Sequence, residues 1–123
     1  MNPFAPAHAI APAVRTGEAS AVKLAEAALA RIDELNPGLN AFTDVTAARA
    51  RAQAAAVDAA VARGDDPGPL AGVPYAVKNL FDIEGVTTRA GSKINRERAP
   101  AAADATLIRR LDAAGAVLLG GLN

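Results

Sequence analysis

The sequence contains no cysteine, and this absence removes several classes of function at once. Without a thiol the chain can form no disulfide, no thiolate metal site and no cysteine nucleophile. The single histidine, His8, lies close to the N-terminus. A zinc site or a serine–histidine–aspartate triad needs a histidine among its partner residues, so we expect a surface or helix-end role for His8. We therefore expect neither a metal ion nor another cofactor.

The sequence also has few aromatic residues, no net charge and no long apolar run. Aromatics make up 3% of the 123 residues, and much of the 51% hydrophobic content is alanine, which predicts a thin core. The 13 basic residues balance the 13 acidic ones, so neither nucleic acid nor a membrane surface is an expected partner. No apolar run approaches the length of about 20 residues that spans a bilayer. The N-terminus also lacks the basic leader of a secretory signal, and we expect a cytoplasmic protein.

The first part of the chain carries helical patterns. Ser20 is a predicted N-cap for a helix that should end at the sequence Asn36-Pro37-Gly38, because proline cannot continue the backbone ladder. The helix shows one apolar stripe at three- and four-residue spacing, made by Val22, Ala25, Leu29 and Ile32. Residues 40–46 resemble a brief extended segment, and residues 47–64 form an alanine-rich helical pattern that ends at Gly64. This second helix should lie close against a neighbour.

The later part of the chain changes to an α/β pattern. Residues 73–77 predict a short strand, Asp104 is a predicted cap for a helix that ends at Gly115, and residues 116–121 form an apolar strand. A strand, a crossover helix and a second strand make a βαβ unit with parallel strands, and an all-apolar second strand indicates burial on both faces. We predict an α/β fold, with an N-terminal helical segment at residues 1–67 and the start of a helix-covered mixed sheet at residues 68–123.

The predicted sheet is incomplete. Two parallel strands with one crossover helix leave edges and faces uncovered, and the chain ends directly after the strand that should be central. Either other chains complete the sheet, or these residues are an N-terminal piece of a longer protein. We expect the second, and we also expect an oligomer.

Lys78 is the main candidate for chemistry. It ends the first strand of the βαβ unit, and ligands of open α/β sheets bind beyond the carboxyl ends of strands. A buried lysine gives up its charge more readily, and a neutral lysine is a competent general base. The alternative is a lysine whose stem covers apolar surface while its ammonium stays in water. The carboxylates of Asp82 and Glu84 follow in a loop, where they could perform acid–base chemistry, hold a hard cation, or serve as solvated or capping groups.

The stretch "GPLAGVPYAVKNLFDIEGVTTRAGSKINR", followed by "DATLIRRLDAAGAVLLGGLN", resembles the N-terminal part of the amidase signature family. The resemblance implies a serine nucleophile, a second serine in a cis peptide linkage, and a lysine that accepts the proton. The family lysine falls on Lys78. The family's serine-rich signature would lie beyond Asn123, so residues 1–123 alone should be inactive. Ser92 falls in a family loop that borders the site and could touch substrate, but it matches no triad serine, and Ser20 is the predicted helix cap.

The resemblance also suggests a substrate and partners. The sequences "AVKNLFDIEGVTT", "AGSKINR" and "LLGGLN" are similar to those of amidases that release ammonia from a small, 1-carboxybiuret-like linear amide in cyanuric acid degradation. Such amidases pair with a small helical subunit like the C-type subunit of tRNA-dependent amidotransferases. Two alternatives stay open: the A-type subunit of a tRNA-dependent amidotransferase, and a non-catalytic truncated scaffold. Many family members have aspartate after the lysine, where this sequence has Asn79.

Overall fold

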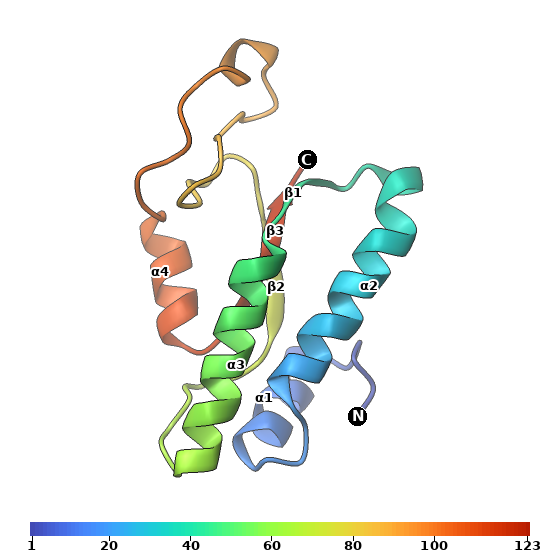
Figure 1. Ribbon diagram of the computed structural model, residues 1–123, viewed down its shortest axis with the longest axis vertical. Coiled ribbons are helices and arrows are strands. Elements are labelled where there is room, and N and C mark those ends of the chain that lie inside the picture. Colours follow the sequence, from blue (N-terminus) through green and yellow to red (C-terminus); the bar gives the residue numbers. More distant parts are fainter.

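A computed structural model describes all 123 residues, from Met1 to Asn123. The helices are α1 (Ala7–Arg15), α2 (Ala21–Leu39), α3 (Ala47–Arg63) and α4 (Thr106–Ala113); the strands are β1 (Phe42–Val45), β2 (Pro74–Lys78) and β3 (Val117–Leu122); and a 3-10 helix, η1, spans Lys93–Asn95. Figure 1 shows α1, α2 and α3 gathered together, while a long loop leaves β2, extends past the end of the sheet and returns to α4. The predicted α/β fold class is confirmed.

The sheet has the strand order β1-β3-β2, with β3 in the centre. β2 runs parallel to β3 and reaches it through α4, so the predicted βαβ unit is present. β1 pairs antiparallel with the other edge of β3, which the sequence does not predict. Gly120 permits this pairing, because a Cβ atom there would lie 2.1 Å from the backbone oxygen of Asp44. Strands from both parts of the chain thus join one sheet, and the division near residue 67 stays a prediction.

The core lies on both faces of β3, because successive side chains of a strand point to opposite faces. Val117 and Leu119 are buried in a large cluster with residues of α1, α2 and α3. Leu118 is buried in a smaller cluster with Ile108 of α4. The predicted two-sided burial of this strand is confirmed. Six of the 14 residues in the large cluster are alanine, so these helices approach the sheet and one another closely.

Helix α2 begins where the sequence predicts and ends later. The Ser20 hydroxyl accepts a hydrogen bond from the backbone N–H of Lys23 at 3.3 Å, which confirms the N-cap. Pro37 lies inside the last turn, and the helix ends at Leu39, with Asn40 in the left-handed conformation at φ 50°. The prediction that the proline ends the helix is wrong. Its φ is compatible with an α-helix, and so near the end it removes only one backbone hydrogen bond.

Helix α1 is not predicted from the sequence, because prolines recur through the N-terminal residues. Pro6 occupies the N-cap position, where no helical N–H is needed, and Pro12 lies inside the helix. Burial of Ile10 and Val14 against α2 and α3 stabilises the helix despite Pro12. His8 is exposed on α1, in agreement with the expected surface role.

Asp104 does not cap α4, which corrects the sequence prediction. The residue at the cap position is Ala105, and no side chain caps the helix. The carboxylate of Asp104 instead accepts two hydrogen bonds from the Arg49 guanidinium, at 2.8 and 2.7 Å, and one from the backbone N–H of Glu84 at 2.8 Å. A two-pronged bond to a charged guanidinium is stronger than a local cap, so the long-range partner prevails.

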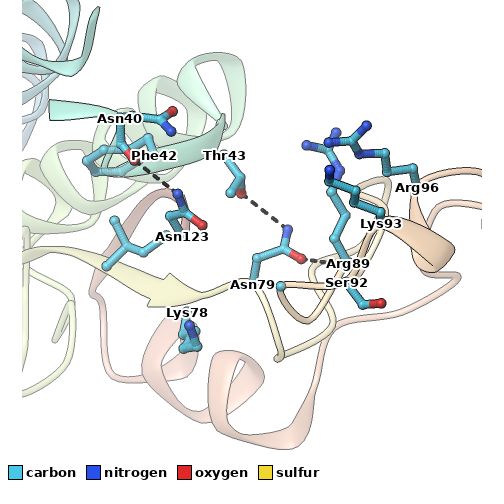
Figure 2. Close-up of a pocket in the computed structure, with 12 residues that line it drawn as sticks. Asn40, Phe42, Thr43, Lys78, Asn79, Arg89, Ser92, Lys93, Arg96 and Asn123 are labelled. Carbon is cyan, nitrogen blue, oxygen red and sulfur yellow. Dashed lines mark hydrogen bonds between the residues drawn. The ribbon is translucent and has the colours of Figure 1, made fainter. Parts of the chain in front are cut away.

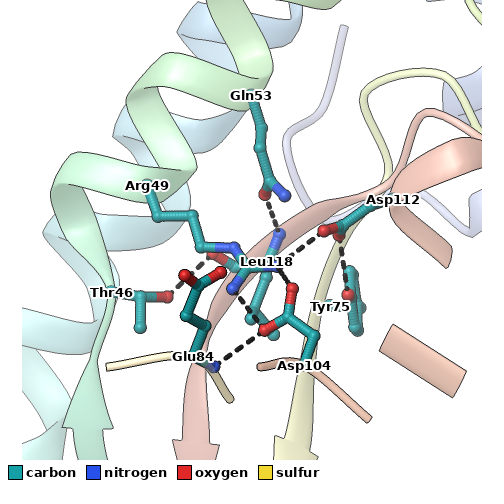
Figure 3. A network of polar contacts seen from close by, with 8 residues as sticks. All are labelled: Thr46, Arg49, Gln53, Tyr75, Glu84, Asp104, Asp112 and Leu118. Carbon is teal, nitrogen blue, oxygen red and sulfur yellow. Dashed lines mark hydrogen bonds and ion pairs between the residues drawn. The ribbon is translucent and has the colours of Figure 1, made fainter. Parts of the chain in front are cut away.

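Arg49 connects α3 to the other side of the βαβ unit (Figure 3). Its guanidinium also contacts the carboxylate of Asp112 at 2.6 Å, and the Tyr75 hydroxyl donates to the same carboxylate at 3.1 Å. Hydrogen bonds from Arg49 hold the pKa of Asp104 below its ordinary value of 3.8. Burial and the negative charge of Asp112 raise the pKa of Tyr75. Through these two carboxylates, the network joins α3 to β2 at Tyr75, to the loop after β2 at Glu84, and to α4 at Asp112.

We expect Arg49→Ala to lower the free energy of unfolding of the full-length protein by about 2–3 kcal/mol at pH 7, because two neighbouring carboxylates lose their cation. The stability that Asp104 contributes is present above its ordinary pKa of 3.8 and is lost as pH falls through its lowered folded-state pKa. The deficit of the variant should therefore shrink below about pH 4. Arg49→Lys keeps the positive charge but cannot make the two-pronged hydrogen bond, so its loss of unfolding free energy should be intermediate. Denaturant titrations across this pH range test the prediction, and a pH-independent deficit would contradict it.

None of the four helices combines the length and the apolarity needed to cross a membrane.

Candidate functional site

Lys78 is the last residue of β2 and lies at the carboxyl end of the two parallel strands, opposite Leu122 of β3. Its side chain is exposed in this structure. Because consecutive side chains of a strand leave on opposite faces, Lys78 and Asn79 project to different sides of the β2 end (Figure 2). The edge where Lys78 lies is the place where parallel α/β sheets bind ligands.

Asn79 is the one buried polar side chain of the chain, with 4% of its surface exposed. Its Nδ2 donates to the Thr43 hydroxyl at 3.3 Å, to the Asp44 carboxylate at 3.3 Å and to the Thr87 carbonyl at 3.2 Å. Its Oδ1 accepts from the backbone N–H of Arg89 at 2.5 Å. The amide thus joins β1 to the loop after β2 and uses both its donor and its acceptor.

The backbone of Asn79 reinforces this junction. Its N–H donates to the carbonyl of Leu122 at 2.8 Å, and its carbonyl accepts from the N–H of Ala90 at 2.8 Å. One residue therefore anchors the end of β3 and the loop at residues 87–90 beside Lys78. An aspartate at this position could not donate to the Asp44 carboxylate, so asparagine fits the surroundings that this chain provides.

A pocket of about 410 Å³ opens at this edge of the sheet. Its lining comes from β1, the ends of β2 and β3, and the loop with η1: Asn40, Phe42, Thr43, Lys78, Asn79, Arg89, Gly91, Ser92, Lys93, Arg96, Leu122 and Asn123. Four of these residues are basic and none is acidic. Figure 2 shows the side chains of Arg89, Lys93 and Arg96 together on the side of Thr43. The pocket is therefore a positively charged site of the size that small ligands occupy.

Ser92 lines the same pocket as Lys78, although the two residues lie on different segments. It precedes η1 and does not cap it through its hydroxyl. Its backbone N–H donates to the carbonyl of Arg89 at 2.9 Å, which closes a turn in the loop. The structure brings together the two residues that the sequence singles out for the site, and their roles in chemistry stay predictions.

Asp82 and Glu84 do not line this pocket. The Asp82 carboxylate accepts a hydrogen bond from the Thr88 hydroxyl at 2.5 Å, and Glu84 contributes its backbone N–H to Asp104. Both side chains are exposed, which agrees with the solvated interpretation of these carboxylates. No group of three or more histidine, cysteine or acidic side chains is arranged to hold a metal ion.

The sequence interpretation missed the three cations that accompany Lys78. Arg89, Lys93 and Arg96 recur at three- and four-residue spacing in the loop "RAGSKINR". This spacing is the only hint in the sequence that the three cations could lie together. In a loop without regular structure, however, spacing does not show which side chains point the same way. The hydrogen bonds of Asn79 to the loop place these cations at the end of the sheet.

The sequence model of the amidase family matches residues 23–123. The chain is 62% identical over 110 residues to AtzE of Pseudomonas sp. (strain ADP), a 1-carboxybiuret hydrolase subunit, covering 89% of this chain and 24% of that protein. It is 48% identical over 114 residues to the A-type subunit of the glutamyl-tRNA(Gln) amidotransferase of Streptomyces avermitilis, covering 93% of this chain and 23% of that protein.

The fold matches a solved structure of an s-triazine catabolic enzyme in an inhibitor-bound complex, which is described as a vestigial protein complex. The TM-score is 0.94 at 58% identity, and the match covers 97% of this chain and 26% of the other. The chain therefore spans about a quarter of the length of the relatives it matches.

Proposed function

Because the match over residues 23–123 shows that this chain belongs to the amidase family, we propose that the full-length protein is an amidohydrolase that releases ammonia from a small linear amide. The observation that carries the proposal is the position of Lys78. It ends β2 at the carboxyl edge of the parallel strands and lines a pocket there. If Lys78 is the catalytic lysine of the family, this pocket gives a substrate room to bind beside it.

In the proposed reaction a serine Oγ attacks the carbonyl carbon of the amide. Its proton passes through a second serine to the Nζ atom of Lys78, and the same proton leaves with the amine when the C–N bond breaks. Water then attacks the carbonyl carbon of the acyl ester and gives its proton to Lys78. The bond to the serine Oγ breaks, the proton passes from Lys78 through the second serine to this Oγ, and the acid is released. The two serines are supplied by residues outside the 123 described here, and Lys78 is the group from this chain that moves the proton.

The proposed substrate is a small carboxylated urea derivative such as 1-carboxybiuret. The 62% identity to a 1-carboxybiuret hydrolase subunit supports it, as does the absence of acidic residues from the pocket lining. We expect the purified full-length protein to release ammonia from 1-carboxybiuret without ATP, tRNA or added metal, measured by a coupled ammonia assay. A preparation that is folded and assembled yet releases no ammonia from this amide would contradict the proposed substrate.

The second candidate function is the A-type subunit of a tRNA-dependent amidotransferase, favoured by 48% identity to one such protein. That enzyme would hydrolyse glutamine and pass ammonia to a mischarged tRNA with the help of partner subunits and ATP. Glutamine hydrolysis that appears only with tRNA, ATP and partner subunits would establish this function. It would overturn the free-standing hydrolase.

A partner chain is part of the proposal in either case. The two relatives are both named as subunits, and the matching solved structure is a complex. We propose that the partner of the full-length protein is a small helical subunit.

A further inference from the structure

Asn79 is hydrogen-bonded through every polar atom it has, and its partners lie on three separate segments. Nδ2 and Oδ1 of its side chain bind β1 and the loop after β2. Its backbone N–H donates to Leu122 at the end of β3, and its backbone carbonyl accepts from Ala90. With 4% exposure, the residue cannot exchange these bonds for water unless the structure opens. The end of β2 is therefore held from three directions.

The same contacts fix the peptide group that joins Lys78 to Asn79. The carbonyl of this group, on Lys78, accepts from the N–H of Phe81 at 3.1 Å. Its N–H, on Asn79, donates to the carbonyl of Leu122 at 2.8 Å. Lys78 is also the Cα partner of Leu122 in the register of β2 and β3. The backbone that sets the direction of the Lys78 Cα–Cβ bond is thus ordered, although the side chain itself is exposed.

Asn79 also holds the turn that leads to Ser92. Its Oδ1 accepts from the N–H of Arg89 at 2.5 Å, and its carbonyl accepts from the N–H of Ala90 at 2.8 Å. Ala90 has φ 49°, a left-handed conformation that costs free energy in a residue with a Cβ atom. The turn closes where the N–H of Ser92 donates to the carbonyl of Arg89 at 2.9 Å. Two consecutive hydrogen bonds to Asn79 therefore stabilise a strained turn beside the pocket.

We infer that Asn79 is a positioning residue for the reaction: it fixes the backbone of Lys78 and the Ser92 turn relative to each other, so that Lys78 stays in place to receive the serine proton. The inference rests on the proposed function and adds a residue that acts without contacting the reacting atoms. The side chains of Lys78 and Asn79 leave the strand on opposite sides, so Asn79 acts through the backbone (Figure 2). A displacement of about 1 Å in a reacting group can lower the rate by about 100-fold.

The first experiment measures the steady-state kinetics of Asn79→Ala in the full-length protein, with 1-carboxybiuret as the substrate. Alanine removes the four side-chain hydrogen bonds, keeps the two backbone ones and adds no charge. We expect kcat to fall by about 10- to 100-fold, while KM changes by less than about twofold. Melting curves set an assay temperature at which every variant is folded.

Arg49→Ala is the matched control for lost stability. It also breaks a partly buried polar network that joins distant segments, but Arg49 does not line the pocket. Its kcat should stay within about twofold of the wild-type value, because no contact beside Lys78 is lost.

Two further measurements separate positioning from a loss of folded protein. A displaced Lys78 slows proton transfer, so the solvent deuterium isotope effect on kcat should increase in Asn79→Ala. A smaller folded fraction lowers kcat and leaves this ratio unchanged. Exchanging the pair as Asn79→Asp with Asp44→Asn returns a donor and an acceptor to the contact between β1 and position 79. This double variant should recover kcat by about threefold or more relative to Asn79→Asp alone.

The second experiment follows Lys78 by nuclear magnetic resonance without any substrate. Reductive methylation with isotope-labelled formaldehyde places methyl groups on each lysine Nζ and keeps its positive charge, and Lys78→Arg and Lys23→Arg assign the two signals. In the wild-type protein the Lys78 signal should differ from that of Lys23, which is exposed on α2. In Asn79→Ala it should move most of the way towards the Lys23 signal, whereas Arg49→Ala should leave it unchanged.

The outcomes separate the inference from the proposed function. A Lys78 signal that moves in Asn79→Ala, in a protein that hydrolyses no amide, supports the positioning of Lys78 by Asn79 and contradicts the proposed function. Amide hydrolysis whose kcat falls no further in Asn79→Ala than in Arg49→Ala overturns the inference and leaves the function standing. A Lys78 signal that does not move, or a fall in kcat with an unchanged isotope effect, overturns it too.

Discussion

Lys78→Ala in the full-length protein is expected to lower kcat for amide hydrolysis by about 10²–10⁴-fold, the range that a positioned general base contributes. The physical reason is that, among residues 1–123, none of the other residues that line the pocket at the carboxyl end of β2 is placed to accept the serine proton. Arg89 and Arg96 in the same pocket are always protonated, and Asn79 has no basic nitrogen. Lys93 lies with the two arginines, away from Lys78 (Figure 2). The measurement is ammonia release under saturating substrate.

The loss should occur without loss of folding. Lys78 is exposed, so its replacement should change the free energy of unfolding by less than about 0.5 kcal/mol. Lys78→Arg gives the sharpest comparison, because arginine keeps the positive charge but cannot give up its proton. It should be as inactive as the alanine variant. Activity retained in Lys78→Arg would show that charge alone is needed, and the assignment of a base would be wrong. Lys23→Ala, which replaces a lysine on α2 far from the pocket lining, is the matched control.

Asn79→Asp is expected to lower the free energy of unfolding by about 2–4 kcal/mol at pH 7. The change replaces three donated hydrogen bonds with a carboxylate that faces the Asp44 carboxylate and the Thr87 carbonyl in a position with 4% exposure. The penalty should be smaller at acidic pH, because a protonated carboxyl group can again donate. Denaturant titration of the full-length protein measures the global effect.

Hydrogen exchange gives a local readout of the same variant. The backbone N–H groups of Arg89 and Ala90 both donate to Asn79, so their protection should fall more than that of α2. Combining Asn79→Asp with Asp44→Asn restores a donor opposite the new carboxylate, and this double variant should recover about half of the lost stability or more. Additive losses in the double variant would show that the two side chains do not interact.

Local signals in the sequence predicted the elements that depend on neighbours along the chain. The Ser20 cap, the alanine-rich α3, the strand before Lys78 and the apolar β3 all follow from spacing and residue type over a few positions. The family resemblance, carried by residues 68–123, placed Lys78 and Ser92 at one site, and both line the same pocket. Propensity failed at Pro12 and Pro37, where burial or a position at the helix end outweighed the proline penalty.

The sequence by itself determined the α/β class, the βαβ unit and the family, because periodicity and contiguous motifs record these directly. Only the tertiary structure decided which distant groups meet. In the folded chain β1 pairs with β3, and Asn79 is buried between β1 and the loop after β2. Asp104 binds the guanidinium of Arg49 and does not cap α4. Residues that lie 35 or 55 positions apart share no local pattern, so their pairing depends on packing and on the need to satisfy every buried polar group.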